Sequence, residues 1–281
     1  MSTDTYVNLF EALPQMAPIT ALSVFFLTVG RILPLMTIVP FLGARNLPMT
    51  VRMMFSVALV AIFLPQNLLS VSSQIAFDLT FMGLMFKELA IGTCLAIFAS
   101  APFYIAQMAG SLIDHSRGSS SLQVNDPTTQ TQSSPIGLVY NYILIALFYN
   151  LGGPFLFFNG LADSYTLLPV DKLINKDFFT LQTSFWKAAF YLAEHIFDLC
   201  IQLGAPALIG VLLTDMFLGI ANRLAPQVQI VFLGMSLKSW VGLALLAAAW
   251  TLILQVMGKE AIAWTKAISQ YVRDAGEFIT R

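Results

Sequence analysis

The chain has 281 residues, of which 57% are hydrophobic and 10% are charged, and its formal net charge is −1. This composition excludes an ordinary soluble domain, and with so little net charge we expect no nucleic-acid partner. Several charge-free runs reach the length of about 20 residues that a membrane span needs. We therefore predict an all-α membrane protein with one helical domain over residues 1–258. Arg31 is the first basic residue and follows Asp4 and Glu11, so we expect no cleaved signal peptide.

The first part of the chain predicts helices that proline interrupts. The apolar segment over residues 18–42 contains Pro34 and Pro40, and we expect two shorter helical pieces there, because proline removes a helical hydrogen bond. The elements expected next are a short helix over residues 50–63 that stops at Pro65 and a longer helix over residues 79–109.

The second part continues this pattern of apolar helices and breaks. A helix over residues 138–150 is expected to break at Gly152-Gly153-Pro154 and to resume over residues 155–162. From Ser184 a helix is expected to run to about Gly204, to stop at Pro206 and to resume as far as Arg223. After a break at residues 225–227, apolar segments cover residues 228–237 and 239–257. Residues 259–281 have helical amphipathic spacing, which predicts a separate helix on the bilayer surface or on a partner.

A polar, glycine-punctuated segment over residues 110–137 separates two long apolar blocks. It contains Asp114, Arg117 and a run rich in Ser, Gln, Asn and Thr. Irregular backbone cannot face lipid, because its N–H and C=O groups would remain unpaired. We therefore expect this segment to lie in water, in a pore or against other protein.

Eight ionisable residues interrupt the apolar segments. A charge at the centre of a bilayer costs at least about 2.5–3.5 kcal/mol, so these side chains need partners, water or a place near a helix end. Glu194 and Asp198 share one helix face with Lys187, which fits either an ion-pair ladder between helices or a polar stripe facing a channel or a neighbouring subunit. The eight residues are Arg31, Lys87, Glu88, Glu194, Asp198, Asp215, Arg223 and Lys238.

Cysteine and histidine give no sign of a metal centre. Cys94 and Cys200 lie far apart in apolar runs and are expected to be small buried side chains. His115 and His195 stand singly, without the spacing of metal ligands. We therefore expect no metal and no cofactor.

Three groups of residues occur in a characteristic order along the chain. The first is Arg31-Ile-x-Pro34 with Pro40-x-x-Gly43 and Pro48-x-x-x-Arg52. The second is Gly110-x-x-Ile-Asp114-x-x-Arg117-Gly118 followed by Asp126-Pro127, and the third is Arg223-x-x-Pro226-Gln227 with Gly234-x-x-Leu-Lys238. Together they resemble the FliR/SctT family, the export-apparatus membrane proteins of bacterial type III secretion systems and flagella. The second group, followed by Ser134-Pro135-x-Gly137, resembles the injectisome (SctT) branch more than the flagellar branch.

The resemblance implies a non-enzymatic structural and gating subunit of an export gate in the bacterial inner membrane. Such a subunit joins several SctR/FliP-like and SctS/FliQ-like proteins, and its interrupted, hairpin-like helices assemble with them into a helical complex around a pore for unfolded secretion substrates. An SctU/FlhB-like switch protein and membrane lipid are further expected partners. The residues expected to contact neighbouring subunits or the lumen are Arg31, Arg52, Lys87, Glu88, Glu194, Asp198, Asp215, Arg223, Gln227 and Lys238.

The resemblance also implies that a loop of this subunit plugs the pore, and residues 110–137 suit that role. Asp114 and Arg117 are three residues apart and would pair if the preceding helix extends that far. Asp126-Pro127 would start a turn. The hinges expected in this segment are Gly110, Gly118 and Gly137. A plain solvated loop between spans is the alternative.

Two other functions are weighed against a secretion subunit. A secondary transporter would place a midplane site around Asp215 and Arg223, with Glu194 nearby, since interrupted helices favour such sites. An intramembrane enzyme would need a catalytic constellation, and His115 between Asp114 and Ser116 is the one candidate. Adjacency in sequence is not catalytic geometry, so we expect no enzyme.

Overall fold

A computed structural model describes residues 18–44, 47–71, 74–118, 124–125, 132–173, 184–224 and 230–276. The chain forms two compact units. Unit 1 consists of Met1–Ser100, Pro154–Phe190 and Trp264–Arg281, and unit 2 consists of Ala101–Gly153 and Tyr191–Ala263. The division into residues 1–258 and 259–281 stays a prediction.

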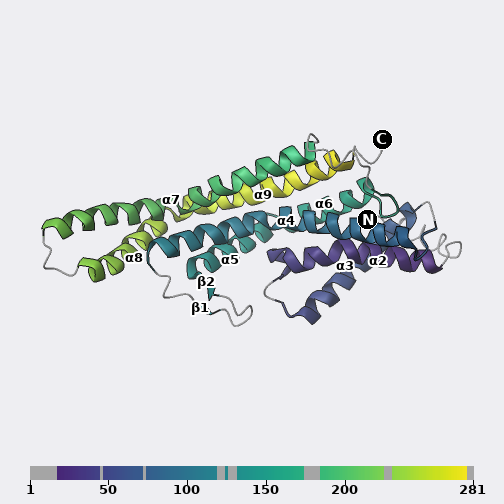
Figure 1. Cartoon of the computed structure of the whole chain (residues 1–281), viewed down its shortest axis with the longest axis horizontal. Coiled ribbons are helices and arrows are strands. Elements are labelled where there is room, and N and C mark those ends of the chain that lie inside the picture. The colour runs from purple at the N-terminus through teal and green to yellow at the C-terminus, as the bar shows by residue number, and fades with distance from the viewer. Residues whose placement is uncertain are drawn as a thin grey trace. The chain divides into compact units, whose positions relative to one another are not determined.

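Unit 1 packs apolar helices around a core of aliphatic and aromatic side chains. Helix α2 (Pro18–Ile38) lies beside α3 (Met49–Ser70), and the short helix η2 (Pro40–Leu42) follows α2 (Figure 1). Unit 1 also holds the first part of α4 (Leu79–Ser116), most of α6 (Gly153–Leu167), the start of α7 (Ser184–Leu224) and the end of α9 (Trp250–Gly276). Edge-to-face contact of Phe41 with Phe157, at a centroid distance of 5.2 Å, joins η2 to α6.

Unit 2 contains α5 (Pro135–Asn150), most of α7 (Ser184–Leu224), α8 (Ile230–Ala248) and the first part of α9 (Trp250–Gly276). Helix α7 runs alongside α9, and His195 Nε2 of α7 lies 3.5 Å from Glu260 Oε2 of α9 (Figure 1). Gly210 lets α8 approach α7 closely, because a Cβ atom there would lie 2.3 Å from Leu245 Cδ1. The Leu245 side chain of α8 therefore occupies the space that a side chain at Gly210 would take.

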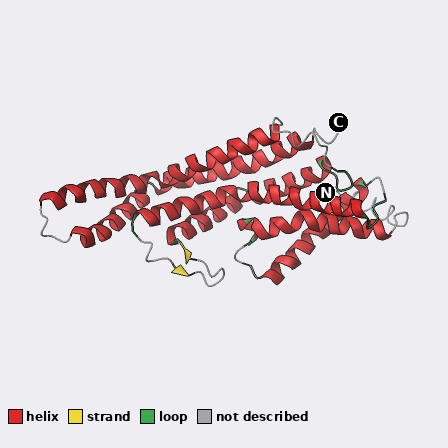
Figure 2. Ribbon diagram, viewed as in Figure 1, coloured by secondary structure: helices red, strands yellow, loops and turns green. Residues whose placement is uncertain are grey.

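The predicted all-α membrane fold is confirmed. Helices dominate Figure 2, and the described strands are two-residue pieces, β1 (Val124–Asn125) and β2 (Gln132–Ser133), which pair antiparallel. Among the described residues, 4 helices are long and apolar enough to cross a membrane, or up to 6 if each bent helix pair is one span. The bent pairs are α5 with α6 and α8 with α9.

Three of the expected proline interruptions are wrong. Helix α2 continues through Pro34, α3 through Pro65 and α7 through Pro206. Pro34 and Pro65 are buried against other helices. Proline removes only its own N–H group, and a membrane helix tolerates the loss when its surroundings compensate the freed backbone. As a result α3 has 22 residues, enough to span, where the sequence predicted a short helix.

The predicted break between residues 150 and 154 is confirmed. Helix α5 ends at Asn150 and α6 begins at Gly153. Gly152 has φ 74°, a left-handed conformation that favours glycine. A Cβ atom at Gly153 would lie 2.2 Å from the Phe148 ring, so both glycines are required by the local geometry.

The polar segment has a shorter non-helical part than residues 110–137. Helix α4 extends through Gly110 and Asp114 to Ser116, and α5 already includes Gly137. Gly110, Asp114 and Gly137 therefore lie in helices, next to the buried apolar side chains of Ala109, Ile113 and Ile136. Residues 119–123 and 126–131, which include Asp126 and Pro127, lie outside the described residues.

The expected boundary near residue 258 falls inside a helix. Helix α8 ends at Ala248, and α9 runs without interruption from Trp250 to Gly276. The described part of the expected amphipathic segment, residues 259–276, thus belongs to a longer helix. The chain bends by 63° at the α8–α9 break.

Candidate functional site

A buried cluster of charges joins α2, α4 and α6 in unit 1. We call Arg31, Lys87 and Glu88, together with the carboxyl end of α6, the Arg31 cluster. Arg31 and Glu88 are fully buried, and the guanidinium contacts both carboxylate oxygens, with Nε 2.6 Å from Oε2 and Nη2 2.9 Å from Oε1. Arg31 also donates to the Ser164 carbonyl and hydroxyl and to the Leu168 carbonyl. All five N–H groups of Arg31 therefore have acceptors.

Lys87 neutralises the same end of α6. Its ammonium lies 2.8 Å from Glu88 Oε1 and donates to the carbonyls of Pro169 and Lys172 at 2.7 and 2.9 Å. The carboxyl end of a helix carries a partial negative charge, and here two cations, Arg31 and Lys87, balance both this charge and the Glu88 carboxylate. Arg31, Lys87 and Glu88 have partners inside this chain, and their expected contact with other subunits or a lumen stays a prediction.

A second polar constellation lies in unit 2 where α4 ends and α5 begins. We call Asp114, Arg117, Ser134 and the backbone of Ile136 the Asp114 junction. Asp114 forms the expected ion pair with Arg117. The same carboxylate accepts hydrogen bonds from the Ser134 hydroxyl and, at 2.9 Å, from the Ile136 N–H. Since Arg117 precedes and Ser134 follows residues 118–133, one buried carboxylate holds both ends of that segment.

The local sequence explains the geometry of the Asp114 junction. Ser134 is the N-cap of α5, and its hydroxyl oxygen accepts from the Gly137 N–H at 2.9 Å. The carboxylate of Asp114 thus lies at the positive end of α5. Gly110 permits the approach, because a Cβ atom there would lie 2.5 Å from Gly137 Cα. Gly118 has φ 78° and ends the α4 turn in a left-handed conformation.

Arg117 extends the Asp114 junction to α8. Its Nη1 donates to the Ser239 hydroxyl at 3.1 Å. Its side chain lies against Gly242, where a Cβ atom would be 3.1 Å from Arg117 Cδ. The Nε group of Arg117 is buried without a hydrogen-bond partner among the described residues.

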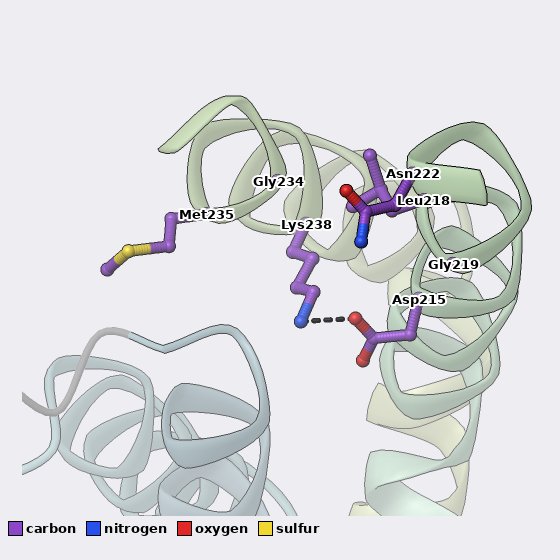
Figure 3. Close-up of a pocket in the computed structure, with 7 residues that line it drawn as sticks. All are labelled: Asp215, Leu218, Gly219, Asn222, Gly234, Met235 and Lys238. Atoms are coloured by element: carbon purple, nitrogen blue, oxygen red, sulfur yellow. Dashed lines mark ion pairs between the residues drawn. The ribbon is translucent and has the colours of Figure 1, made fainter. Parts of the chain in front are cut away.

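A shallow hollow lies between the end of α7 and the start of α8. Lys238 projects from α8 towards Asp215 of α7, and the two form an ion pair at the base of the hollow (Figure 3). Their side chains are 26% and 44% exposed, so water reaches this pair. The hollow has a volume of about 290 Å³ and is lined by Asp215, Leu218, Gly219, Asn222, Gly234, Met235 and Lys238.

The remaining predicted contact residues are dispersed. Glu194, Asp198 and Arg223 are exposed on α7. Arg52 of α3 is half-buried and donates to the Ala44 carbonyl at 2.9 Å. Gln227 lies outside the described residues.

The structure does not assemble the alternative sites. Asp215 pairs with Lys238, while Arg223 lies eight residues further along α7, about 12 Å away along the helix axis. Asp114 bonds to Arg117, Ser134 and Ile136, whereas His115 is exposed on α4. No group of three or more metal-ligating side chains gathers among the described residues.

Sequence reasoning missed the neutral partners. Ser134, Ser164 and Ser239 complete the polar constellations, and Gly92 lets α4 approach α2. Ser134 before Pro135 is a helix-start signal that the sequence did offer. Nothing in the sequence distinguishes Ser164 or Ser239 from other serines in helices.

Comparison with known proteins gives a consistent family. Residues 22–262 match the family described as bacterial export proteins, family 1. The secretion system apparatus protein SsaT of Salmonella typhimurium is 30% identical over 200 residues, covering 70% of this chain and 73% of that protein. The flagellar biosynthetic protein FliR of Bacillus subtilis is 28% identical over 236 residues, covering 83% of this chain and 88% of that protein.

A third relative points to the same branch as SsaT. The Yop proteins translocation protein T of Yersinia pestis is 32% identical over 169 residues, 59% of this chain and 62% of that protein. These similarities favour the SctT branch over the flagellar branch, as the sequence pattern indicated. The match to the export family covers most of the chain, including the Arg31 cluster and the Asp114 junction. The chain therefore belongs to the FliR/SctT family of bacterial export proteins and is a multi-pass inner-membrane component of an export apparatus.

Proposed function

We propose that the chain is a non-enzymatic structural and gating subunit of a type III secretion export gate. It contributes to the pore through which unfolded proteins leave the cell, and residues between Arg117 and Ser134 close that pore. The observation that carries this proposal is the Asp114 junction, where one carboxylate bonds groups on both sides of this polar segment. A gating segment needs both freedom between its ends and a fixed place to return to. The bonds of Asp114 to Arg117 and Ser134 provide that fixed place, because these residues flank the polar segment.

Helix α7 supports the part of the proposal that concerns partner subunits. Large apolar side chains are exposed on it from Phe197 to Leu224, a distance of about 40 Å at about 1.5 Å per residue. The hydrocarbon core of a bilayer is about 30 Å thick, and a tilt of about 20° shortens the vertical extent of the stripe only slightly. Lipid therefore leaves part of it uncovered. The stripe consists of Phe197, Ile201, Ile209, Leu212, Leu213, Met216, Phe217, Ile220 and Leu224.

Protein is the cover that such a stripe requires outside the bilayer. SctR/FliP-like and SctS/FliQ-like subunits are the partners we propose for this face, with an SctU/FlhB-like protein as a further neighbour. Co-expression tests this part. The chain alone in detergent is expected to be heterogeneous, and the chain with the two smaller subunits is expected to elute as one complex. A stable, monodisperse monomer would overturn it.

The gating part is tested by removing the segment while keeping its anchors. Residues 119–131 are replaced by a short Gly/Ser linker, so that Arg117 and Ser134 remain, and the complete apparatus is assembled in membranes. We expect normal amounts of co-purified partners and an increased ion leak. A Gly/Ser replacement of the full length separates the effect of length from that of sequence. An unchanged conductance after the shortening rules out a closing role.

A further inference from the structure

The hollow between the end of α7 and the start of α8 contains hydrogen-bond donors and acceptors close together. In Figure 3 the Asn222 carboxamide projects from α7 on the same side as Asp215, above the ion pair of Asp215 with Lys238. This carboxamide has no hydrogen-bond partner among the described residues. An ammonium has three N–H groups and a carboxylate about four acceptor positions, so one ion pair leaves capacity on both Lys238 and Asp215. The hollow therefore offers donors and acceptors to a further polar group.

The space and the charge of the hollow favour one neutral side chain. Small-molecule sites occupy about 300–1,000 Å³ and bury most of their ligand, whereas this hollow is shallow and has a volume of about 290 Å³. Gly219 adds room, because a Cβ atom there would meet nothing within 4 Å. Asp215 and Lys238 are the charged residues of the lining, and their charges cancel. A carboxylate would be repelled by Asp215 and a cation by Lys238, so the lining favours neither ion.

Lipid does not suit the same place. Asp215 lies in the apolar part of α7 that is long enough to cross a membrane, Ala193–Leu224, and hydrocarbon penalises a charge there. The side chains of the ion pair are 26% and 44% exposed, so α7 and α8 alone do not cover it. Exposed apolar side chains adjoin the hollow, with Met235 in its lining and Ile220 directly after Gly219. A protein surface with polar groups among apolar ones matches this combination.

We propose that the hollow binds a carboxamide side chain, from asparagine or glutamine, of a neighbouring subunit of the export apparatus. The carbonyl oxygen of the bound group accepts from Lys238 and from the Asn222 NH₂ group, and its own NH₂ group donates to Asp215. A carboxamide is a neutral group that donates and accepts together, and its binding leaves the ion pair intact. This inference rests on the proposed assembly with partner subunits and deepens it, because it names the chemistry of one contact.

The test measures how fast the two smaller subunits leave the tagged, immobilised chain in detergent. Asn222→Ala removes the carboxamide of the hollow. Asn150→Ala is the matched control, because Asn150 is exposed and its NH₂ group bonds to the Ala146 carbonyl of its own helix. Gly219→Leu fills the hollow, while Gly219→Ala keeps it open with a Cβ atom that meets nothing within 4 Å. Thermal unfolding of each variant checks that the chain is folded.

We expect Asn222→Ala to increase the dissociation rate about two- to tenfold, the range that one net hydrogen bond supplies. Gly219→Leu should increase it by at least about tenfold, because the new side chain excludes the whole carboxamide and all of its hydrogen bonds. The double variant should dissociate no faster than Gly219→Leu, since the bound group is already absent. Asn150→Ala and Gly219→Ala should keep the rate of the unmodified complex.

A photoreactive side chain in the hollow identifies its occupant. Met235 lines the hollow, and a diazirine analogue of methionine at this position keeps the size of the side chain. Illumination of the complete apparatus should attach it to a partner subunit, at a stretch that contains asparagine or glutamine, and Gly219→Leu should lower the yield. Attachment to lipid, attachment to this chain itself or reaction with water alone overturns the inference.

The outcomes separate this inference from the function on which it rests. If the two smaller subunits do not co-purify with the unmodified chain, the proposed assembly falls, and the carboxamide contact falls with it. If they co-purify but leave Asn222→Ala or Gly219→Leu at the unmodified rate, the assembly stands and the contact alone falls. An equal acceleration in Asn150→Ala or Gly219→Ala also overturns the contact, because it shows a general loosening of the complex.

Discussion

The Arg31 cluster and the Asp114 junction both place buried charged side chains at a helix end, but the charges have opposite signs. Each places charge at a helix end: cations at the carboxyl end of α6 in the first, and a carboxylate at the amino end of α5 in the second. In the Arg31 cluster the guanidinium has five hydrogen bonds and stacks over the Tyr165 ring at 4.2 Å. In the Asp114 junction the guanidinium contacts one carboxylate oxygen and one hydroxyl, and its Nε has no acceptor among the described residues.

The difference shows which charges hold the fold and which are available for change. In the Arg31 cluster every N–H group of the arginine has an acceptor, so the loss of one partner leaves a buried group unpaired. The Asp114 junction has one buried donor, Arg117 Nε, without an acceptor among the described residues. We therefore expect changes in the Arg31 cluster to lower the free energy of unfolding, and changes in the Asp114 junction to alter conductance more than stability.

The largest effect is expected from Glu88→Gln. The substitution keeps the shape of the side chain but leaves Arg31 and Lys87 as two buried cations without a counterion, which costs about 3–5 kcal/mol. Thermal unfolding of the purified apparatus in detergent, together with the amount of chain in membranes, measures the loss. Lys259→Gln, at an exposed position of α9, is the control and should change stability by less than about 0.5 kcal/mol. An equal change in thermal unfolding in the two variants would show that the Arg31 cluster does not stabilise the fold.

A smaller loss is expected from Gly92→Ala. The new Cβ atom would lie 2.3 Å from the Arg31 carbonyl oxygen, so α4 must move away from α2, at a cost of about 1–3 kcal/mol. Gly219→Ala provides the comparison, because a Cβ atom there meets nothing within 4 Å. That exposed helical position should gain up to about 1 kcal/mol. Opposite signs in thermal unfolding would show that close helix approach at Arg31, and not glycine itself, is what matters.

Compared with Glu88→Gln, Asp114→Asn should have a smaller effect on stability and a larger effect on conductance. The amide oxygen still accepts from Ile136, but Arg117 is left as a buried cation without its carboxylate, so the loss should be about 3 kcal/mol, at the lower end of the range for a broken buried pair. The leak of the assembled apparatus should nevertheless rise, because Arg117 is no longer held. The same two measurements on Glu88→Gln should give the opposite pattern, a large loss of stability with little leak from the complexes that do assemble. Matching patterns in both variants would abolish the distinction between the two regions.

The smallest effect is expected from Lys238→Met. Its ion pair with Asp215 is partly exposed, and exposed pairs contribute about 0–1 kcal/mol. Thermal unfolding should hardly change. Asp215→Asn, measured in parallel, addresses the transporter alternative: uptake of small solutes should be absent in both the unmodified protein and the variant. Uptake that is lost in Asp215→Asn would instead favour a transport site at this hollow.

The sequence predicted helices well and their interruptions poorly. Gly152-Gly153-Pro154 breaks the chain as expected, because two glycines there have conformations or contacts that exclude a side chain. The helices are not broken at Pro34, Pro65 and Pro206. A single proline removes only one hydrogen bond, and its surroundings determine whether the helix tolerates that loss. A helix break was predictable where several helix-breaking residues are adjacent. It was not predictable where a single proline lies in a helix that is packed against its neighbours.

Polar contacts were predictable only when both partners were near in sequence. The Asp114–Arg117 pair follows from a spacing of three residues on a helix, and the structure contains it. Arg31 and Glu88 were both recognised as misplaced charges, but 57 residues separate them, and no pattern indicates that they pair. The backbone carbonyls of α6 that complete their environment have no sequence signature at all.

The partners of Arg31 lie far from it in sequence, and this separation has a consequence for the synthesis of the protein. The arginine leaves the ribosome first, its carboxylate partner follows 57 residues later, and the acceptors in α6 follow 133 and 137 residues later. A solitary arginine in a nascent span costs at least about 2.5–3.5 kcal/mol. The span formed by α2 therefore carries this cost during synthesis until the later helices emerge. The Arg31 cluster can therefore form only after α6 has been synthesised.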